Sequence, residues 1–243
     1  MSLVRLDKFL TMNGCGTRSE VKKLLKTGTV LVNGLPARKP EMKIDAEADV
    51  IAVAGKQLVY EPFVCLMFHK PAGCITAASD RQRKTVMDYI KHERKEELFP
   101  VGRLDIDTEG LLLLMNDGDL SHRLLSPKHH VEKTYYVRVE GVVTEEDARA
   151  FEVGVDIGEK NLTLPAKLHI LKSDAVSEAE LTICEGKFHQ VKRMFAARGK
   201  QVIYLKRISM AGIRLDEKLE AGKWRALTEE EIRMLKGTGY AEK

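Results

Sequence analysis

The chain of 243 residues is 44% hydrophobic and 31% charged, with 18 Gly and 7 Pro, which is typical of a globular protein and excludes fibrous and disordered classes. Its four Cys are far apart and form no C-x-x-C motif, so we expect reduced thiols, no zinc site and no disulfide framework. The net charge of +4 lies entirely within residues 1–60, which hold 10 Lys and Arg against 6 Asp and Glu, because residues 61–243 hold 30 of each class.

The first eight residues contain Arg5, Asp7 and Lys8, where a secretory signal would need an apolar run. No apolar stretch approaches the roughly 18 residues that a membrane-spanning helix needs. We therefore expect a cytoplasmic protein without a membrane partner.

Residues 6–10 and 21–25 each carry apolar side chains at positions i, i+3 and i+4, which predicts two short amphipathic helices. Thr17 and Glu20 have the spacing of a capping box, in which the hydroxyl and the carboxylate each bind an otherwise unpaired amide. Gly28 is expected to end the second helix.

A hairpin follows the second predicted helix. Thr29–Val32 leads into Asn33-Gly34, a pair that tolerates positive φ at both positions of a tight turn, and Asp49–Ala54 supplies a further strand. Residues 1–40 hold eight basic residues against two acidic ones. Such a focused positive field suits a polyanion, although a solvated helix face is the simpler alternative.

This arrangement resembles the small αL-type RNA-binding domain of ribosomal small-subunit protein four. The resemblance is carried by Arg5–Leu10, Ser19-Glu20-Val21, Gly28-Thr29-Val30 and Val32-Asn33-Gly34. In that family the helix pair and the loop after it grip folded RNA, so the resemblance implies phosphate contacts that position RNA without reading its sequence. The residues that it assigns to these contacts are Arg5, Arg18, Lys22, Lys23, Lys26, Arg38 and Lys39.

Residues 55–62 have little periodicity, and we place a domain boundary near residue 60, which gives domains of residues 1–60 and 61–243. Segments rich in β-branched and aromatic residues then predict strands at Phe63–Phe68, Lys133–Val139, Leu162–Lys172, Glu178–Ile183 and Gln201–Ile208. Helices are predicted at Thr85–Lys95, Thr144–Phe151, Val191–Arg198 and Thr228–Lys236. Because the strands outnumber the helices and do not alternate with them, we expect an α+β domain on a mixed, mostly antiparallel sheet.

Residues 102–118 place acidic side chains at positions 105, 107 and 109 before the apolar run Leu111–Met115. This order predicts a loop that leads into a core element. By chemistry alone, the candidate functional carboxylate is Asp105, which follows Arg103 and Leu104. A charged surface turn before a core strand is the alternative interpretation.

The same block resembles the active-site motif of pseudouridine synthases, through Gly102-Arg103-Leu104-Asp105, Thr108 and Gly110–Leu114. Three further motifs of that family stand in the expected order, at His69–Gly73, Glu132–Tyr135 and Gly186–Met194. The stretch Leu120–His130 is most similar to the small-subunit branch, the RsuA family, which modifies 16S rRNA. The resemblance therefore implies a pseudouridine synthase catalytic domain behind the RNA-binding domain.

That resemblance implies a reaction in which the bond from ribose C1′ to uracil N1 breaks and the rotated base rejoins through C5, with no cofactor. Asp105 takes the place of the catalytic carboxylate, which either attacks C1′ or removes the 2′ proton. Tyr135 takes the place of the ring that stacks on a uracil flipped out of the RNA. Its neighbour Tyr136 should point to the opposite face of the strand.

A cation near Asp105 would keep the carboxylate ionised and oriented. The apolar spacing of residues 191–195 predicts a helix on which Lys192 and Arg193 lie about 100° apart. The motif places Lys192 at the family's catalytic-site basic position, with Arg193 as the second choice. Many relatives have Arg there, which can hold a carboxylate with two N–H groups where Lys cannot.

Other basic residues have weaker assignments. Arg103 is expected to contact RNA phosphate or to help eject the base, and Lys128 to lie on an RNA-facing surface beside His129-His130. Lys70 and Pro71 are expected to be structural. The histidines match no standard zinc spacing, so no metal is expected.

Several alternatives stay open. The target RNA could be 23S rRNA, or the protein could be a non-catalytic RNA-binding or ribosome-assembly factor. Glycoside hydrolysis by the acidic cluster is disfavoured, because it needs two carboxylates on opposite sides of a sugar and gives the basic domain no purpose. The expected partner is ribosomal RNA within a small-subunit assembly intermediate, and we expect a monomer.

Overall fold

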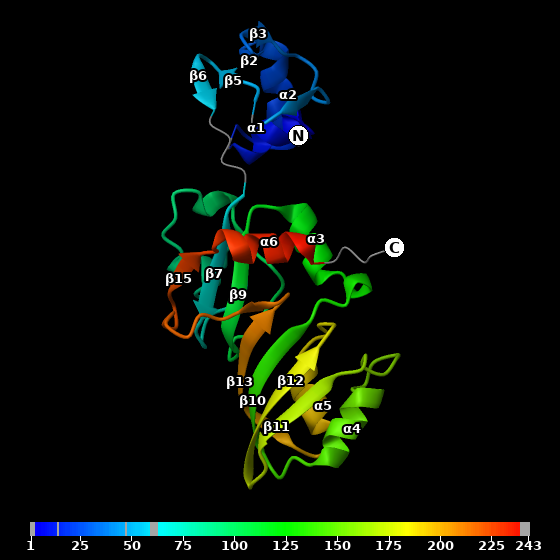
Figure 1. Ribbon diagram of the computed structural model, residues 1–243. Helices are drawn as coiled ribbons and strands as arrows, with labels where there is room; N and C mark the ends of the chain where they lie inside the picture. Colours follow the sequence, from blue (N-terminus) through cyan, green and yellow to red (C-terminus); the bar gives the residue numbers. More distant parts are fainter. Residues whose placement is uncertain (1–2, 14, 47, 59–62, 239–243) are drawn as a thin grey trace. The chain divides into compact units, whose positions relative to one another are not determined.

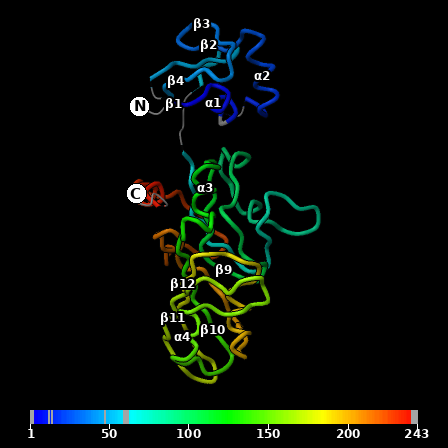
Figure 2. The backbone as a smooth tube through the Cα atoms, turned by 90° about the vertical axis from the view of Figure 1, so that its right-hand side faces the viewer, coloured from blue at the N-terminus to red at the C-terminus, as the bar shows by residue number. Residues whose placement is uncertain are grey.

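The structure is a computed structural model that describes residues 3–13, 15–46, 48–58 and 63–238. The chain forms two compact units, Met1–Phe63 and Val64–Lys243 (Figures 1 and 2). The boundary expected near residue 60 falls among residues 59–62, which lie outside the described residues.

The first unit packs two helices against short strands. Its elements are β1 (Leu3–Arg5), α1 (Leu6–Met12), α2 (Arg18–Thr27), β2 (Val30–Val32), β3 (Leu35–Pro36), β4 (Lys43–Asp45), β5 (Ile51–Val53) and β6 (Lys56–Leu58). β1 pairs with β4, and a separate sheet has the order β3-β2-β5-β6. Leu6, Phe9 and Leu10 of α1 and Val21 and Leu25 of α2 are buried in one core with Val30, Ile44 and Ile51.

Local sequence signals explain this unit well. The capping box of Thr17 and Glu20 is present at the start of α2, and Gly28 ends that helix in the left-handed conformation. Asn33 and Gly34 both have positive φ, at 51° and 82°, in the tight turn between β2 and β3. The predicted helix pair and hairpin are therefore confirmed.

The second unit is built on one large mixed sheet. Its elements are β7 (Cys65–Lys70), the 3₁₀ turns η1 (Val86–Tyr89) and η2 (Lys95–Glu97), β8 (Phe99–Pro100), β9 (Glu109–Met115), α3 (Gly118–Leu125), η3 (Pro127–His129), β10 (Lys133–Glu140), α4 (Glu145–Val153), β11 (Lys167–Lys172), β12 (Val176–Ile183), α5 (Gln190–Ala196), β13 (Gln201–Met210), β14 (Ile213–Arg214), β15 (Trp224–Ala226) and α6 (Glu229–Gly237). The main path of the sheet is β11-β12-β10-β13-β9-β7-β15, with β14 beside β13 and β8 beside β9.

The pair β13–β9 is parallel, and the other neighbours along this path are antiparallel. The predicted α+β fold with a mixed, mostly antiparallel sheet is therefore confirmed. At the parallel junction Gly110 has φ 105°, and a Cβ there would lie 2.2 Å from the carbonyl oxygen of Arg207. The close approach of β9 and β13 thus requires glycine at this position.

Two helices cover one face of the sheet at its β10–β12 end. Phe151 of α4 and Phe195 of α5 meet edge to face with ring centroids 5.1 Å apart, and both belong to the core that contains Val137 and Leu181. α3 lies toward the opposite end of this unit in both views (Figures 1 and 2). This packing places residues 186–189, the segment before α5, close to Tyr135 of β10.

Two predicted elements differ from the structure. The helix expected at Thr85–Lys95 is replaced by two separate 3₁₀ turns, because residues 91–97 have no apolar side chain that could bury a helix face. The strand expected at Leu162–Lys172 begins only at Lys167. The first residues of the expected strand bind α4 and the segment that follows α4 instead. The amide of Thr163 donates to the carbonyl of Val155, and the amide of Ala166 donates to the carbonyl of Phe151.

The pattern did not predict α3, which Asp117 caps by accepting hydrogen bonds from the amides of Asp119 and Leu120. All four Cys are free. Among the described residues, no helix combines the length and apolar character needed to cross a lipid bilayer.

Candidate active site

Asp105 lies in the loop between β8 and β9, and a buried cation holds that loop. Lys70 at the end of β7 is 0% exposed, and its Nζ donates to the carbonyl oxygens of Asp105 at 2.9 Å and Thr108 at 2.8 Å. The same Nζ donates to the carbonyl of Pro71 at 3.1 Å. Burial lowers the pKa of Lys70, and the carboxylates in and beside the loop partly offset that effect.

A second set of hydrogen bonds holds the other side of the loop. Thr76 donates its hydroxyl to the carbonyl of Leu104 at 2.8 Å and accepts the Leu104 amide at 3.1 Å. The Gly73 amide donates to the carbonyl of Ile106 at 2.7 Å. The motif around residues 69–73 therefore positions Asp105 through backbone contacts, which is consistent with the structural role expected for Lys70 and Pro71.

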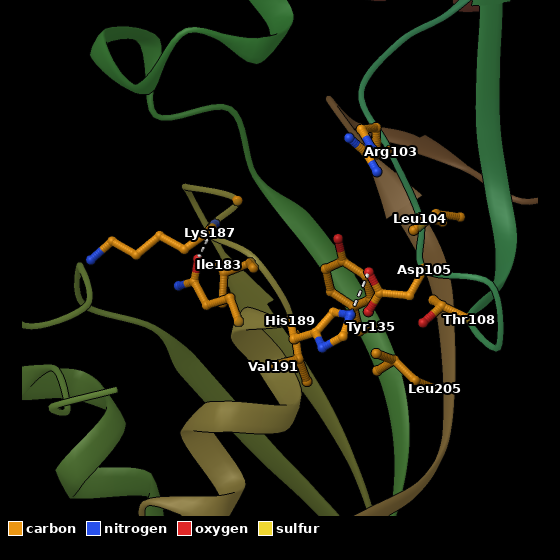
Figure 3. Close-up of a pocket in the computed structure, with 12 residues that line it drawn as sticks. Arg103, Leu104, Asp105, Thr108, Tyr135, Ile183, Lys187, His189, Val191 and Leu205 are labelled. Carbon is orange, nitrogen blue, oxygen red and sulfur yellow. Dashed lines mark hydrogen bonds and ion pairs between the residues drawn. The ribbon is translucent and has the colours of Figure 1, made fainter. Parts of the chain in front are cut away.

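Two side chains from distant segments, Tyr135 and His189, lie beside Asp105. Figure 3 shows Asp105, Tyr135 of β10 and His189 turned toward one another, with Oδ1 of Asp105 3.6 Å from Nε2 of His189. His189 precedes α5 in the left-handed conformation, with φ 49°. Tyr135 is buried and pairs with Leu181 on one side and Arg207 on the other.

These residues lie in a cleft of about 590 Å³. Its walls also include Arg83 and Arg103, which are exposed, and Lys187 and Phe188. Pockets for small ligands usually have volumes of about 300–1,000 Å³, and the volume of this cleft lies within that range. The cleft thus combines a carboxylate, an aromatic ring and cations.

Lys192 links the acidic loop to α5. Its Nζ donates to both carboxylate oxygens of Asp107, at 2.6 Å and 2.8 Å, and lies 3.6 Å from Oδ2 of Asp105. The hydrogen bond from Lys192 lowers the pKa of Asp107, and burial acts against it. The side chain of Asp105 is 28% exposed, whereas that of Asp107 is 66% exposed.

Arg193 faces a different segment. Its Nη1 donates to Glu159 at 2.8 Å and to the carbonyl of Phe188 at 3.0 Å, and its Nη2 donates to the carbonyl of Ile157. The structure therefore brings Lys192 to Asp105 and directs Arg193 to the loop after α4. Tyr136 lies on the face opposite Tyr135, as alternation predicts, and meets Tyr204 with ring centroids 6.1 Å apart.

The residues predicted to contact RNA lie on the surfaces of both units. On α2, Arg18, Lys22, Lys23 and Lys26 are exposed. Arg38 and Lys39 are also exposed, and Arg5 forms an ion pair with Asp7 at 2.8 Å. In the second unit, Arg103 is exposed at the cleft and Lys128 is exposed on η3.

Sequence reasoning gave no functional role to three further residues of the cleft: Lys133, Phe188 and Arg207. Phe188 is 72% exposed and stacks on His189 with ring centroids 3.8 Å apart. A usable signal for Arg207 existed, because alternation along β13 places it on the same face as the buried Leu205. A charged side chain on the inward face of a strand is unusual and indicates a specific role.

Within the described ranges, no cluster of three or more His, Cys, Asp and Glu could hold a metal ion. His189 lines the cleft beside Asp105. His122, His129 and His130 lie exposed on α3 and the segment after it.

Comparisons with known proteins agree across both units. The model of the RNA pseudouridylate synthase family matches residues 64–197, and that of the S4 domain matches residues 4–51. An uncharacterized RNA pseudouridine synthase of Bacillus subtilis, YtzG, is 46% identical over 234 residues, covering 96% of this chain and 98% of the relative. Ribosomal small subunit pseudouridine synthase A of Escherichia coli K12 is 40% identical over 231 residues, covering 94% of this chain and 98% of the relative.

A solved crystal structure of a pseudouridylate synthase is also similar. It has a TM-score of 0.68 and 40% sequence identity, and the match covers 96% of this chain and 99% of the other. The similarity therefore extends over both units.

Proposed function

The chain belongs to the RNA pseudouridylate synthase family and carries an S4 domain, and from this premise we propose that it isomerises a specific uridine of 16S rRNA to pseudouridine. Relatives that are about equally long and 40–42% identical carry the name ribosomal small subunit pseudouridine synthase A, which supports the small-subunit RNA as the substrate. The enzyme is of the RsuA type.

The observation that carries the proposal is the meeting of Asp105 and Tyr135, from separate segments, in one cleft, with Lys192 of α5 beside the Asp105 carboxylate. The carboxylate of Asp105 lies 3.6 Å from Nζ of Lys192, close enough for electrostatic attraction to orient the carboxylate. Tyr135 and Asp105 both line the cleft, so a base beside the Tyr135 ring has its ribose within reach of the carboxylate.

In the proposed reaction, the bond from C1′ to N1 breaks and a bond from C1′ to C5 forms. N1 gains a proton, and C5 loses its proton to solvent. The carboxylate of Asp105 either attacks C1′ or removes the 2′ proton. Substrate and product are isomers, so the proposal needs no cofactor.

The target nucleotide must leave its stack to reach this site. Tyr135 lines the cleft but is only 8% exposed, so a uridine that stays paired within a helix would not stack on it. We propose that the uracil is everted and stacks on Tyr135, at an unstacking cost of about a few kcal/mol. RNA binding by the S4 domain and by Arg103 and Lys128 offsets that cost.

We also propose that the enzyme acts as a monomer in the cytoplasm on an assembling small subunit. Folded RNA is read through its shape and its unpaired bases, which an assembly intermediate still exposes. In the second unit, the exposed Lys128 and the neighbouring His129-His130 are suited to such contacts.

The decisive test measures pseudouridine in unmodified 16S transcripts and in small-subunit intermediates after incubation with the wild type and with Asp105→Asn. We expect product from the wild type and a loss of at least about 10³-fold in the variant, with RNA binding retained. Asp107→Asn is the matched control, since it removes the carboxylate that binds Lys192 most closely but keeps the Asp105 carboxylate itself. It should stay within about tenfold of the wild type.

Two outcomes would redirect the proposal. Product on 23S rRNA alone would assign the enzyme to the large subunit. RNA binding without product from the wild type on any rRNA substrate would indicate a non-catalytic assembly factor. Mapping pseudouridine in the rRNA of a strain that lacks this protein identifies the modified position.

A further inference from the structure

Two buried cations lie beside Tyr135. Lys133 of β10 is 7% exposed and Arg207 of β13 is 2% exposed, and both line the cleft that contains Asp105. Lys133 and Tyr135 share one face of β10 because they are two residues apart, and Arg207 is the direct cross-strand partner of Tyr135. The three side chains therefore form one surface inside the cleft.

Neither cation has an anionic partner among the described residues. Nζ of Lys133 donates to the carbonyl of Val131 at 2.8 Å, and Nε of Arg207 donates to the carbonyl of Leu111 at 2.7 Å. Carbonyl groups orient the side chains but carry no net charge. Nη2 of Arg207 is buried and has no hydrogen-bond partner.

This arrangement is electrostatically unfavourable in the free protein. Burial, together with the nearby charge of Arg207, lowers the pKa of Lys133 to about 8. Buried charges are normally paired or bound to a ligand, because an unpaired charge loses its hydration without compensation. Two unneutralised cations and a free guanidinium N–H are the features of a site prepared for an anion.

We propose that Lys133 and Arg207 form a binding subsite for a phosphate of the RNA strand next to the target uridine. This inference rests on the proposed function and extends it, because it assigns the residues that anchor the everted nucleotide by its backbone. A guanidinium suits phosphate, since its N–H groups can bind two oxygens at once. RNA supplies the phosphate on the same molecule as the uracil beside Tyr135.

The charge around the cleft supports an anionic strand as the occupant. Arg83 and Arg103 are exposed at its walls, so the approach is positive from outside as well as inside. Lys187 does not belong to the subsite, because it donates to the carbonyl of Leu162 at 3.2 Å and pairs with Glu185 at 3.6 Å.

The first arm of the test needs no RNA. Sulfate, a tetrahedral dianion, is titrated into the full-length protein with ¹³C-labelled lysine, and the Lys133 side-chain resonance is assigned from its loss in Lys133→Met. We expect sulfate to shift that resonance saturably in the wild type. In Arg207→Met, the resonance should remain but sulfate should no longer shift it. Lys167, exposed on β11, is the internal control in the same spectrum. A Lys133 resonance that stays fixed, or moves only in parallel with Lys167, would overturn the subsite.

The second arm measures binding of unmodified 16S transcript as a function of salt, with all variants in the Asp105→Asn background to prevent turnover. Lys133→Met should bind about tenfold more weakly, and the slope of log Kd against log salt should fall by about 0.7–0.9, the value for one lost phosphate contact. Lys167→Met should match the Asp105→Asn parent. An unchanged slope in a folded Lys133→Met protein would contradict an RNA phosphate as the ligand.

The two arms separate the possible failures. A saturable sulfate shift together with product formation and a reduced salt slope supports the proposal. A sulfate shift with an unchanged salt slope would mean an adventitious ion only and overturns the assignment to RNA. Absence of product from the wild type would refute the proposed function, while the sulfate arm would still report on the subsite.

Discussion

At the scale of single residues, the position of Asp105 depends on a cation that is fully buried. Lys70 binds the backbone carbonyls of Asp105 and Thr108, so it fixes the loop without touching the Asp105 side chain. Removing it would leave several carbonyl groups unpaired in the interior, each at a cost of about 1–3 kcal/mol. The role of this lysine is to orient the backbone rather than to bind substrate.

The two adjacent cations of α5 have different surroundings, and mutation should separate them. Lys192→Met should lower kcat by about 10²-fold, because the electrostatic support of Asp105 is lost. Arg193→Met should leave kcat within about threefold. It should lower the free energy of unfolding by about 1 kcal/mol, because the hydrogen bonds to Glu159 and to two backbone carbonyls are lost. Single-turnover pseudouridine formation and urea denaturation measure the two effects.

Rescue distinguishes an electrostatic role from a packing role at position 192. Lys192→Arg should recover activity relative to Lys192→Met, because it restores the cation near Asp105 and Asp107. A large loss of kcat in Arg193→Met together with a fully active Lys192→Met would reverse the assignment.

At the scale of secondary structure elements, the cap of α4 also anchors the chain after α5. Asp147 is 0% exposed and accepts the Thr144 amide at 2.9 Å, Nε of Arg198 at 3.0 Å and Nζ of Lys200 at 3.0 Å. Burial raises the pKa of Asp147, but the hydrogen bonds from Thr144, Lys200 and Arg198 outweigh it and hold the pKa below its ordinary value.

Asp147→Asn should therefore lower the free energy of unfolding by about 2 kcal/mol at pH 7, because two partly exposed cations lose their buried carboxylate partner. The folded-state pKa is depressed, so this stabilisation is present above the unfolded pKa and is lost as the pH falls through the folded value. The difference between variant and wild type should shrink below about pH 4. Urea denaturation at pH 7 and at pH 3 measures it.

Glu146→Gln serves as the control, since it removes an exposed carboxylate from the first turn of the same helix and should change stability by less than about 0.5 kcal/mol. A stability deficit of Asp147→Asn that is equal at both pH values would show that lost packing, and not lost charge, causes it.

At the scale of the whole molecule, charge is divided between the two parts of the chain. Residues 1–60 carry the entire net charge of +4, and the basic side chains of α2 are exposed, while the rest of the chain is neutral as a whole. In the second unit, the Lys and Arg residues that line the cleft are Arg83, Arg103, Lys133, Lys187 and Arg207. RNA affinity and chemistry should therefore respond separately to mutation.

The double substitution Lys22→Ala with Lys23→Ala should weaken binding of 16S transcript and reduce the salt slope by about 1.4–1.8, the value for two phosphate contacts. At saturating RNA, kcat should remain that of the wild type, because the Asp105 site is unaltered. Filter binding across a salt series and single-turnover assays test this. Lys160→Ala with Lys218→Ala, two exposed lysines of the second unit, is the control, and equal losses in both double variants would indicate a nonspecific charge effect.

Much of the fold could be predicted from local signals. The capping boxes at Thr17, Thr144 and Thr228 and the Asn33-Gly34 turn form as their sequences indicate, because a cap or a tight turn depends on residues only a few positions apart. The helix expected at Thr85–Lys95 is absent because residues 91–97 have no apolar side chain to bury, and because its first residues bind a distant segment. The amide of Val86 donates to the carbonyl of Ile75, and this hydrogen bond ties the segment to another part of the chain.

The amino-acid sequence by itself determined the family motifs, the basic first unit and Asp105 as the candidate carboxylate, because these are properties of residue type and short-range spacing. Only the tertiary structure decided that α5 turns Lys192 toward Asp105 and Arg193 toward Glu159. It also decided that Lys133 and Arg207, on different strands, meet unneutralised in one cleft. Such pairings depend on how helices and strands pack across the sheet, and packing is set by contacts between residues far apart in the chain.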